Sequence, residues 1–164
     1  MSNQQLETDS LLLLQTLADF RFELRRFLHF SESAALDAGL QPQQHQLLLQ
    51  VAGARAGTAV TIAYAAERLG LKHNSAVELV DRSEREGLLE RTVDAEDRRR
   101  AILRVTRRGR QLLARLSRDH ARELKDLAPR LAQALEQIRG QIRDHQDAAA
   151  VQGAAGVAAG VEAQ

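Results

Sequence analysis

Two short helical segments lie so close together in this sequence that they are expected to fold as a pair. The run IAYAAERL (62–69) has helical character, and Gly70 after it can adopt the left-handed conformation that ends a helix. A second helix is expected to start almost at once and to run from about Lys72 to Glu86, where Gly87 ends it. Two helices joined by so short a turn are typical of a helix-turn-helix unit.

Two strand-like runs follow this pair. LLERTV (88–93) and AILRVT (101–106) contain β-branched residues, and the charged DAEDRRR between them favours a β-hairpin. A hairpin directly after a helix-turn-helix predicts a winged helix. Upstream, the β-branched Val60 and Thr61 are expected to add one short strand pairing, and Thr61 to cap the helix that follows it.

The flanking segments carry helical apolar stripes. A long helix is expected over 9–38, a second helix over 42–52 with Pro42 in its first turn, and a further long helix after the cap residue Thr106, which Pro129 should kink or restart. A small winged-helix unit is unable to cover these stripes, so we expect a second chain to cover them. The stripe in the first helix consists of Leu13, Leu17, Phe20, Leu24 and Phe27.

The predicted fold class is therefore mainly α, a winged helix-turn-helix with N- and C-terminal dimerisation helices and a small β wing. The domain is expected to cover residues 9–147, with the winged helix at about 42–106 and the dimerisation helices at about 9–38 and 107–147. Residues 148–164 form an Ala/Gly-rich tail, which is expected to be disordered.

Composition excludes several function classes. The chain has no cysteine, which removes disulfides, thiolate zinc sites, iron–sulfur clusters and cysteine nucleophiles. No catalytic set and no phosphate-binding glycine loop is present, so we expect neither an enzyme nor a cofactor. The first ten residues lack the basic stretch of an export signal, and no apolar run approaches the roughly 20 residues that span a bilayer, so a cytoplasmic location without membrane contact is expected.

Charge is distributed unevenly, although the formal net charge is only +1. The segment from Leu88 to Arg118 contains ten arginines and four acidic residues. This excess of positive charge predicts an anion-facing surface around the hairpin and the helix after it.

Four segments in this order resemble the MarR family of bacterial winged-helix transcription regulators: GLQPQQHQLLL, AERLGL, SAVELVDRSEREGLLER and DAEDRRRAILRVTRRGRQLL. The resemblance runs from about Leu11 to Ile142. It implies a homodimer, packed through its terminal helices, that binds double-stranded DNA at a pseudo-palindromic operator. It also implies that a small ligand, often aromatic or acidic, relieves this binding.

The N-terminal turn of the second helix of the pair is the expected base-reading element, because such turns reach base edges in the major groove. Asn74 suits adenine, which an amide can pair bidentately. The alternative is that Asn74 and Ser75 only cap the helix. Glu78 departs from the family pattern, and an ion pair with Arg82 is favoured over a base contact. The residues expected to bind DNA here are Thr61, Lys72, His73, Asn74, Ser75 and Arg82.

The hairpin tip is the second expected DNA contact, because a protruding arginine suits a narrow minor groove. Arg98, Arg99 and Arg100 are the candidates, and the resemblance implies that Asp97 orients one of them through a salt bridge. The alternative is a solvated charged turn. For the arginines that follow, phosphate contact and simple surface charge remain equally open; they are Arg107, Arg108 and Arg110.

A ligand cleft is expected between the first helix and the winged-helix unit, although rings at helical spacing more often form core. Its candidate residues are Phe20, Phe27, His29, Phe30 and His45. No histidine pair has the i, i+4 spacing of a helical zinc site, so no metal ligands are assigned and a metal-responsive regulator is only an alternative. His29, His45 and His120 are better explained as helix-interface residues. Another alternative is a winged-helix adaptor whose basic hairpin binds an acidic protein.

Overall fold

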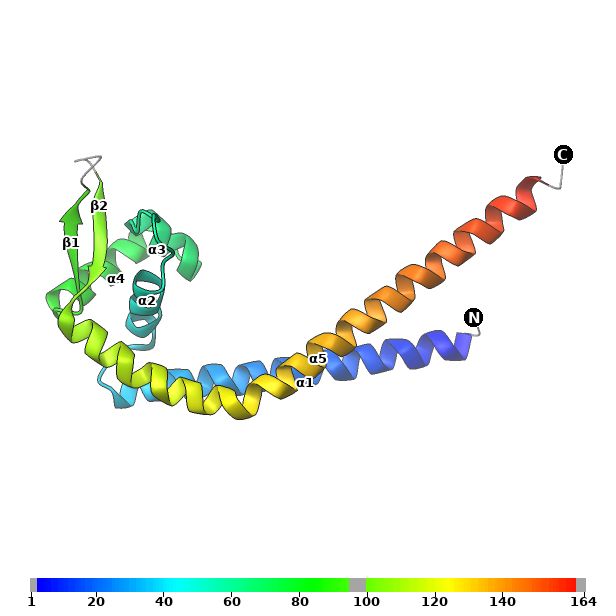
Figure 1. The fold of residues 1–164 in the computed structure, drawn as a ribbon, viewed down its shortest axis with the longest axis horizontal. Helices are drawn as coiled ribbons and strands as arrows, with labels where there is room; N and C mark the ends of the chain where they lie inside the picture. Colours follow the sequence, from blue (N-terminus) through cyan, green and yellow to red (C-terminus); the bar gives the residue numbers. More distant parts are fainter. Residues whose placement is uncertain (1–2, 95–99, 162–164) are drawn as a thin grey trace. The chain divides into compact units, whose positions relative to one another are not determined.

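The computed structural model describes the backbone of residues 3–94 and 100–161 and the side chains of residues 10–94 and 100–143. Within these residues the chain is mainly helical with one two-stranded antiparallel sheet (Figure 1). The predicted fold class is confirmed. The elements are α1 (Asn3–Asp37), α2 (Pro42–Ala52), α3 (Ile62–Leu69), α4 (His73–Arg85), β1 (Leu89–Val93), β2 (Ala101–Val105) and α5 (Arg107–Val161).

The chain divides into two compact units. The winged-helix unit comprises residues 29–122 and therefore holds α2, α3, α4, both strands and the adjoining parts of α1 and α5. The terminal-helix unit comprises the described parts of residues 1–28 and 123–164. The two long helices, α1 and α5, each contribute to both units.

The core of the winged-helix unit is built from one apolar face of each element. In α4, Ala76, Leu79, Val80 and Ser83 recur at helical spacing and are all buried. The other helices, the two strands and the connections between them supply the rest. The largest apolar side chains that fill this core are Leu40, Leu47, Leu48, Leu79, Leu88, Leu89, Leu103 and Leu116.

The wing consists of β1 and β2 paired antiparallel, with Leu89 opposite Val105 and Arg91 opposite Leu103. Side chains alternate between the two faces of a strand. Leu89, Leu103 and Val105 therefore face the core, and Glu90 and Arg104 lie opposite each other on the outer face. The register thus places Arg91 on the inner face with the apolar core side chains, and Glu90 and Arg104 on the outer face.

The short strand expected at Val60 and Thr61 does not form in the described residues; the sheet has two strands. Val60 O instead accepts a single hydrogen bond of 2.7 Å from the Leu103 backbone N–H. The chain has to start α3 at once, because Thr61 is its N-cap, and this leaves too few extended residues for a ladder.

Capping residues define the helix ends of this unit, as the sequence predicts. The Thr61 hydroxyl oxygen accepts a hydrogen bond of 3.2 Å from the Tyr64 N–H, and Gly70 has the left-handed φ of +64°. At the start of α5, Thr106 Oγ1 accepts from the Gly109 N–H at 3.1 Å and donates to Gly87 O at 2.7 Å. Thr106 therefore joins the beginning of α5 to the turn after α4.

Gly109 packs so closely against the start of the wing that a side chain would not fit. An added Cβ would lie 2.2 Å from Leu88 O and 2.6 Å from Val105 Cγ1. We expect Gly109→Ala to lower the free energy of unfolding by about 1–3 kcal/mol, measured by urea denaturation, because the clash involves backbone. Gly140→Ala is the matched control, since nothing lies within 4 Å of its added Cβ. An equal effect of both substitutions would contradict this close packing.

The terminal-helix unit pairs the N-terminal part of α1 with the C-terminal part of α5. Arg130 Nε lies 3.4 Å from Glu23 Oε1, and Arg26 Nη2 lies 3.8 Å from Glu123 Oε1. Leu127, Ala134 and Thr16 are buried here. Pro129 was expected to kink or restart the helix; a restart does not occur, since α5 is one helix from Arg107 to Val161 with Pro129 inside it.

The tail expected to be disordered continues α5 as far as Val161. Alanine is the strongest helix former, and the Ala-rich composition of residues 148–161 favours extension of a helix that is already nucleated.

Eleven of the thirteen large apolar side chains that are exposed in the described part of the chain belong to α1 and α5. Phe22 and Leu14 are the most exposed of these, at 64% and 61%. The others are Leu11, Leu12, Leu17, Leu24, Leu28, Leu36, Leu124, Leu135 and Ile142.

Candidate nucleic-acid interface

The N-terminal end of α4 presents polar side chains to solvent. Lys72, His73, Asn74 and Ser75 are all exposed. The N-cap position is Lys72, whose side chain forms no capping hydrogen bond. No hydrogen bond of the Asn74 or Ser75 side chain occurs within the described residues, so neither of them caps the helix here, and both are available to a ligand.

The same exposed face continues along α4 through Glu78 and Arg82. Among the described residues no ion pair joins Glu78 to Arg82, so the structure does not show the pair that was expected. The side chain of Arg82 lies instead along a small cavity with Pro42 and Leu79, which directs it towards the start of α2. Thr61 is half-buried, and its hydroxyl oxygen is used in capping α3.

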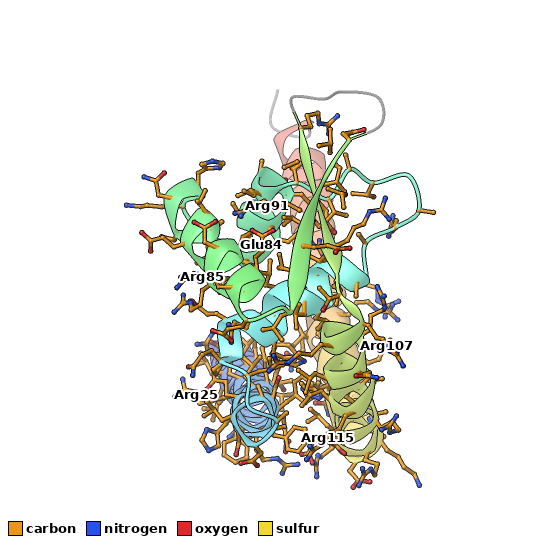
Figure 2. The ribbon with its side chains drawn as sticks, turned by 90° about the vertical axis from the view of Figure 1, so that its left-hand side faces the viewer. Arg25, Glu84, Arg85, Arg91, Arg107 and Arg115 are labelled. Carbon is orange, nitrogen blue, oxygen red and sulfur yellow. The ribbon has the colours of Figure 1, made fainter. Side chains whose placement is uncertain are left out.

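A further face of α4 is fastened to the wing by Arg91, a contact that the sequence analysis missed. The Arg91 guanidinium, on β1, forms ion pairs with Asp81 and Glu84 of α4, and the Arg91 backbone N–H donates to Glu84 Oε1 at 3.1 Å. Burial alone would lower the pKa of Arg91, but the hydrogen bond to Asp81 and the two carboxylate charges raise it overall. Figure 2 shows Arg91 and Glu84 between the wing and α4. This contact fixes the helix and the wing relative to each other.

Asp94 and Arg100, the described residues that follow β1 and precede β2, are bonded to each other. The Asp94 N–H donates to Arg100 O at 3.0 Å, and Arg100 Nε lies 3.9 Å from Asp94 Oδ2. Arg100 is exposed, as a DNA contact requires. The other predicted wing residues, Asp97, Arg98 and Arg99, lie outside the described residues.

The arginines at the start of α5 divide into two groups. Arg108 Nη1 donates to Glu86 O at 3.0 Å, and Arg110 Nη1 donates to Val105 O at 2.5 Å. These two side chains therefore help to attach α5 to the wing. Arg107 is exposed and forms no ion pair with another described residue, so it is available to a phosphate.

A buried polar cluster joins α1, α2 and α5 inside the winged-helix unit. His120 Nδ1 donates to Leu116 O at 2.7 Å, and a neutral ring then accepts at Nε2 from the Ser31 hydroxyl, 2.8 Å away. The centroid of the His120 ring lies 5.0 Å from that of His45 and 5.4 Å from that of Phe30. Ser31 and His45 are both buried.

The predicted cleft residues fall in different places. Phe30 and His45 meet at His120, as described above, while His29 is exposed. Phe20 and Phe27 belong to the terminal-helix unit, where Phe20 lines a cavity of about 440 Å³ together with Glu23 and Arg130. The structure thus brings two of the five residues together.

Burial, and to a smaller extent the nearby His120, lowers the pKa of His45 from its ordinary value of 6.5. The unfolded chain therefore binds a proton at His45 more readily than the folded chain. Above pH 6.5 His45 is neutral in both states, and the folded state keeps its full stability. As the pH falls from 6.5 towards the lower pKa of folded His45, the unfolded chain takes up a proton first, and the free energy of unfolding decreases. We expect a smaller free energy of unfolding at pH 5.5 than at pH 7.5, measured by urea denaturation.

His45→Gln should reduce this pH dependence, and His29→Gln, at an exposed histidine, should leave it unchanged. The explanation fails if the His45 variant retains the full pH dependence.

Two further findings bear on the kind of site. In the described residues no group of three or more His, Cys, Asp or Glu side chains is placed to hold a metal ion. Likewise, none of the described helices has a stretch long and apolar enough to span a membrane.

Comparison with known proteins agrees with this geometry. No curated protein matches the chain. One structural neighbour is the crystal structure of a MarR family transcription regulator, 21% identical, which covers 90% of this chain and 98% of its own with a TM-score of 0.67. Another is MarR from E. coli, 14% identical, with 74% and 92% coverage and a TM-score of 0.57. A third is a variant of MepR from S. aureus bound to an oligodeoxyribonucleotide, 19% identical, with 79% and 94% coverage and a TM-score of 0.57.

At these identities the structural neighbours establish the fold alone. The sequence evidence comes from the model of the MarR family, which matches residues 38–100, from the end of α1 through α4 and into the wing. The segment of this chain that holds α2, α3, α4 and β1 is therefore similar in sequence to the MarR family of transcription regulators.

Proposed function

We propose that this chain is a transcription regulator of the MarR family, and that it acts as a homodimer that binds duplex DNA at a pseudo-palindromic operator. The observation that carries the proposal is the exposed polar turn at the start of α4, fixed beside the wing by the ion pairs of Arg91 with Asp81 and Glu84. A helix end and a hairpin held in fixed relation are what simultaneous reading of a major and a minor groove requires. The DNA-bound MepR variant with the same fold supports this assignment.

In this proposal the residues have distinct roles. Asn74 reads adenine through its amide, while Lys72 binds a guanine or a phosphate near the positive end of the helix. His73 and Ser75 supply less selective hydrogen bonds. In the wing, Arg100 and the preceding Arg98 and Arg99 enter the minor groove, with Asp97 holding one of them in place. The remaining candidate contacts are Thr61 and Arg82.

Dimerisation is proposed from the exposed apolar side chains of α1 and α5. So many large apolar residues on two helices form a surface that a monomer rarely leaves in water. A two-fold pair would present two copies of α4, and half-sites about one helical turn, roughly 34–36 Å, apart. The operator is therefore expected to be an inverted repeat.

Relief by a small aromatic or acidic ligand is part of the same proposal. The contact of Phe30 and His45 with His120 joins α1, α2 and α5, so a molecule that changed this contact would act on the base of the winged-helix unit. Phe20, Phe27 and His29 are the other candidate ligand contacts. Near His45 and His120, the aromatic ring of such a ligand would meet apolar side chains, and its carboxylate would meet hydrogen-bonding groups.

The test is selection of duplexes from a random library, followed by titration of the enriched sequence by fluorescence anisotropy with excess unspecific polyanion present. We expect an inverted repeat whose binding survives the competitor and is lost with Arg99→Ala. If no duplex is enriched and binding disappears under competition, the proposal is wrong and the alternative of an adaptor for an acidic protein is favoured.

A further inference from the structure

A groove runs along the outer flank of the wing, on the side away from α4. It has a volume of about 550 Å³ and lies between β2 and the connection from α2 to α3. In Figure 2 that connection passes beside the wing on one side while α4 lies on the other. We call it the outer wing groove. Its lining includes Arg55, Thr58, Val60, Glu90, Arg104 and Arg110.

The rim of the outer wing groove is positively charged. Arg55 is exposed and forms no ion pair or hydrogen bond through its side chain with another described residue. Arg104 is also exposed, and its Nε donates only to Thr92 Oγ1, at 3.3 Å. Glu90 lies directly opposite Arg104 in the sheet, but the two form no ion pair within the described residues. Arg55 and Arg104 therefore keep most of their donors for an outside partner.

The floor of the groove is apolar. Val60 and Leu103 are buried and are joined by the 2.7 Å hydrogen bond from the Leu103 N–H to Val60 O. This bond fixes the connection that carries Arg55 to the strand that carries Arg104. Arg55 and Arg104, which come from separate parts of the chain, are thus held on one surface, and neither forms an ion pair with a carboxylate of another described residue.

We infer that the outer wing groove contacts the phosphate backbone of DNA that flanks the half-site, beyond the bases that α4 and the wing read. This inference rests on the proposed function. A hairpin in the minor groove, about 6 Å wide, has a phosphate strand along each flank. The inner flank of the wing faces α4. The outer flank therefore faces the DNA that continues beyond the half-site. An open, arginine-rimmed groove suits a continuous polyanion better than an enclosed small molecule.

The test uses two duplexes with the same selected operator, one ending at the half-sites and one extended by about ten base pairs on each side. For the extended duplex we expect Arg55→Ala and Arg104→Ala each to weaken binding roughly three- to tenfold. Each should also reduce the slope of log K against log salt by about 0.9, the value for one phosphate contact. On the short duplex both variants should equal the wild type.

Arg115→Ala is the matched control, because Arg115 is exposed on α5 and outside the groove, and it should leave both slopes unchanged. Glu90→Gln should have the opposite effect on affinity. Removal of this carboxylate should tighten binding to the extended duplex. A merely structural role of these residues would not produce opposite effects. Unfolding temperatures of all variants should match that of the wild type.

The outcomes are separable. If the wild type binds both duplexes but the variants keep its slope on the extended one, or lose affinity equally on both, the inference is wrong and the proposed function stands. If the wild type binds neither, the proposed function itself has failed. Arg104-dependent binding of benzoate or inorganic phosphate, with an unchanged DNA slope, would assign the groove to a small anion and overturn the inference.

Discussion

The double variant Leu17→Glu/Leu24→Glu is expected to run as a single chain in sedimentation velocity and to lose operator binding by at least roughly a hundredfold. Both leucines are 38% exposed on α1 and belong to the apolar stripe of that helix. A buried, unpaired carboxylate at an interface costs several kcal/mol, and two per chain are repeated by symmetry. Operator binding is lost with the dimer, because a single chain engages one half-site only.

Gln15→Glu/Ser33→Glu is the matched control, since it adds the same two negative charges at polar, exposed positions of α1. It should keep both the dimer and the affinity. A double variant that remains dimeric would show that the stripe is not the interface. A monomeric double variant that still binds the operator with wild-type affinity would show that pairing is not needed for recognition.

Asn74→Ala is expected to weaken binding to the selected operator by about 5- to 150-fold, which corresponds to the 1–3 kcal/mol of one bidentate base contact. Its side chain is exposed at the start of α4 and forms no hydrogen bond within the described residues, so the loss would come from DNA contact and not from the cap. Binding to unrelated duplexes should change little, because Asn74 contributes no charge.

The control for Asn74 is Gln111→Ala, which removes an exposed amide from α5 in the same unit. A complementary test replaces single base pairs of the operator. The wild type should discriminate against replacement of one particular A·T pair in each half-site, and the Asn74 variant should not. Equal losses on specific and unrelated DNA would instead indicate a structural effect on α4.

The elements of the winged-helix unit were predictable because their signals are local. Gly70 and Thr61 mark the ends of α3 with residue types that the required backbone conformation or cap demands, and the structure places both as expected. The hairpin followed from β-branched runs around a charged connection, which is also a short-range pattern. Local chemistry therefore sufficed for the element order.

Contacts between distant residues were not predictable in the same way. Arg91 is linked to Asp81 and Glu84 across the turn after α4, and nothing in the spacing distinguished it from the nine other arginines of its segment. The Glu78–Arg82 pair, by contrast, has ideal helical spacing and does not form, because Arg82 lies towards the start of α2. The contact of Ser31 with His120 spans 89 residues and carried no sequence signal.

The central claim is that two chains present matched helix ends to one face of a duplex. The most direct measurement is binding to the selected inverted repeat before and after insertion of five base pairs between its half-sites, with the protein-to-duplex ratio determined in the same experiment. Five base pairs rotate one half-site by about half a helical turn. We predict two chains per duplex and an affinity at least roughly a hundredfold lower after the insertion. One chain per duplex, or equal affinity for both spacings, would contradict the claim.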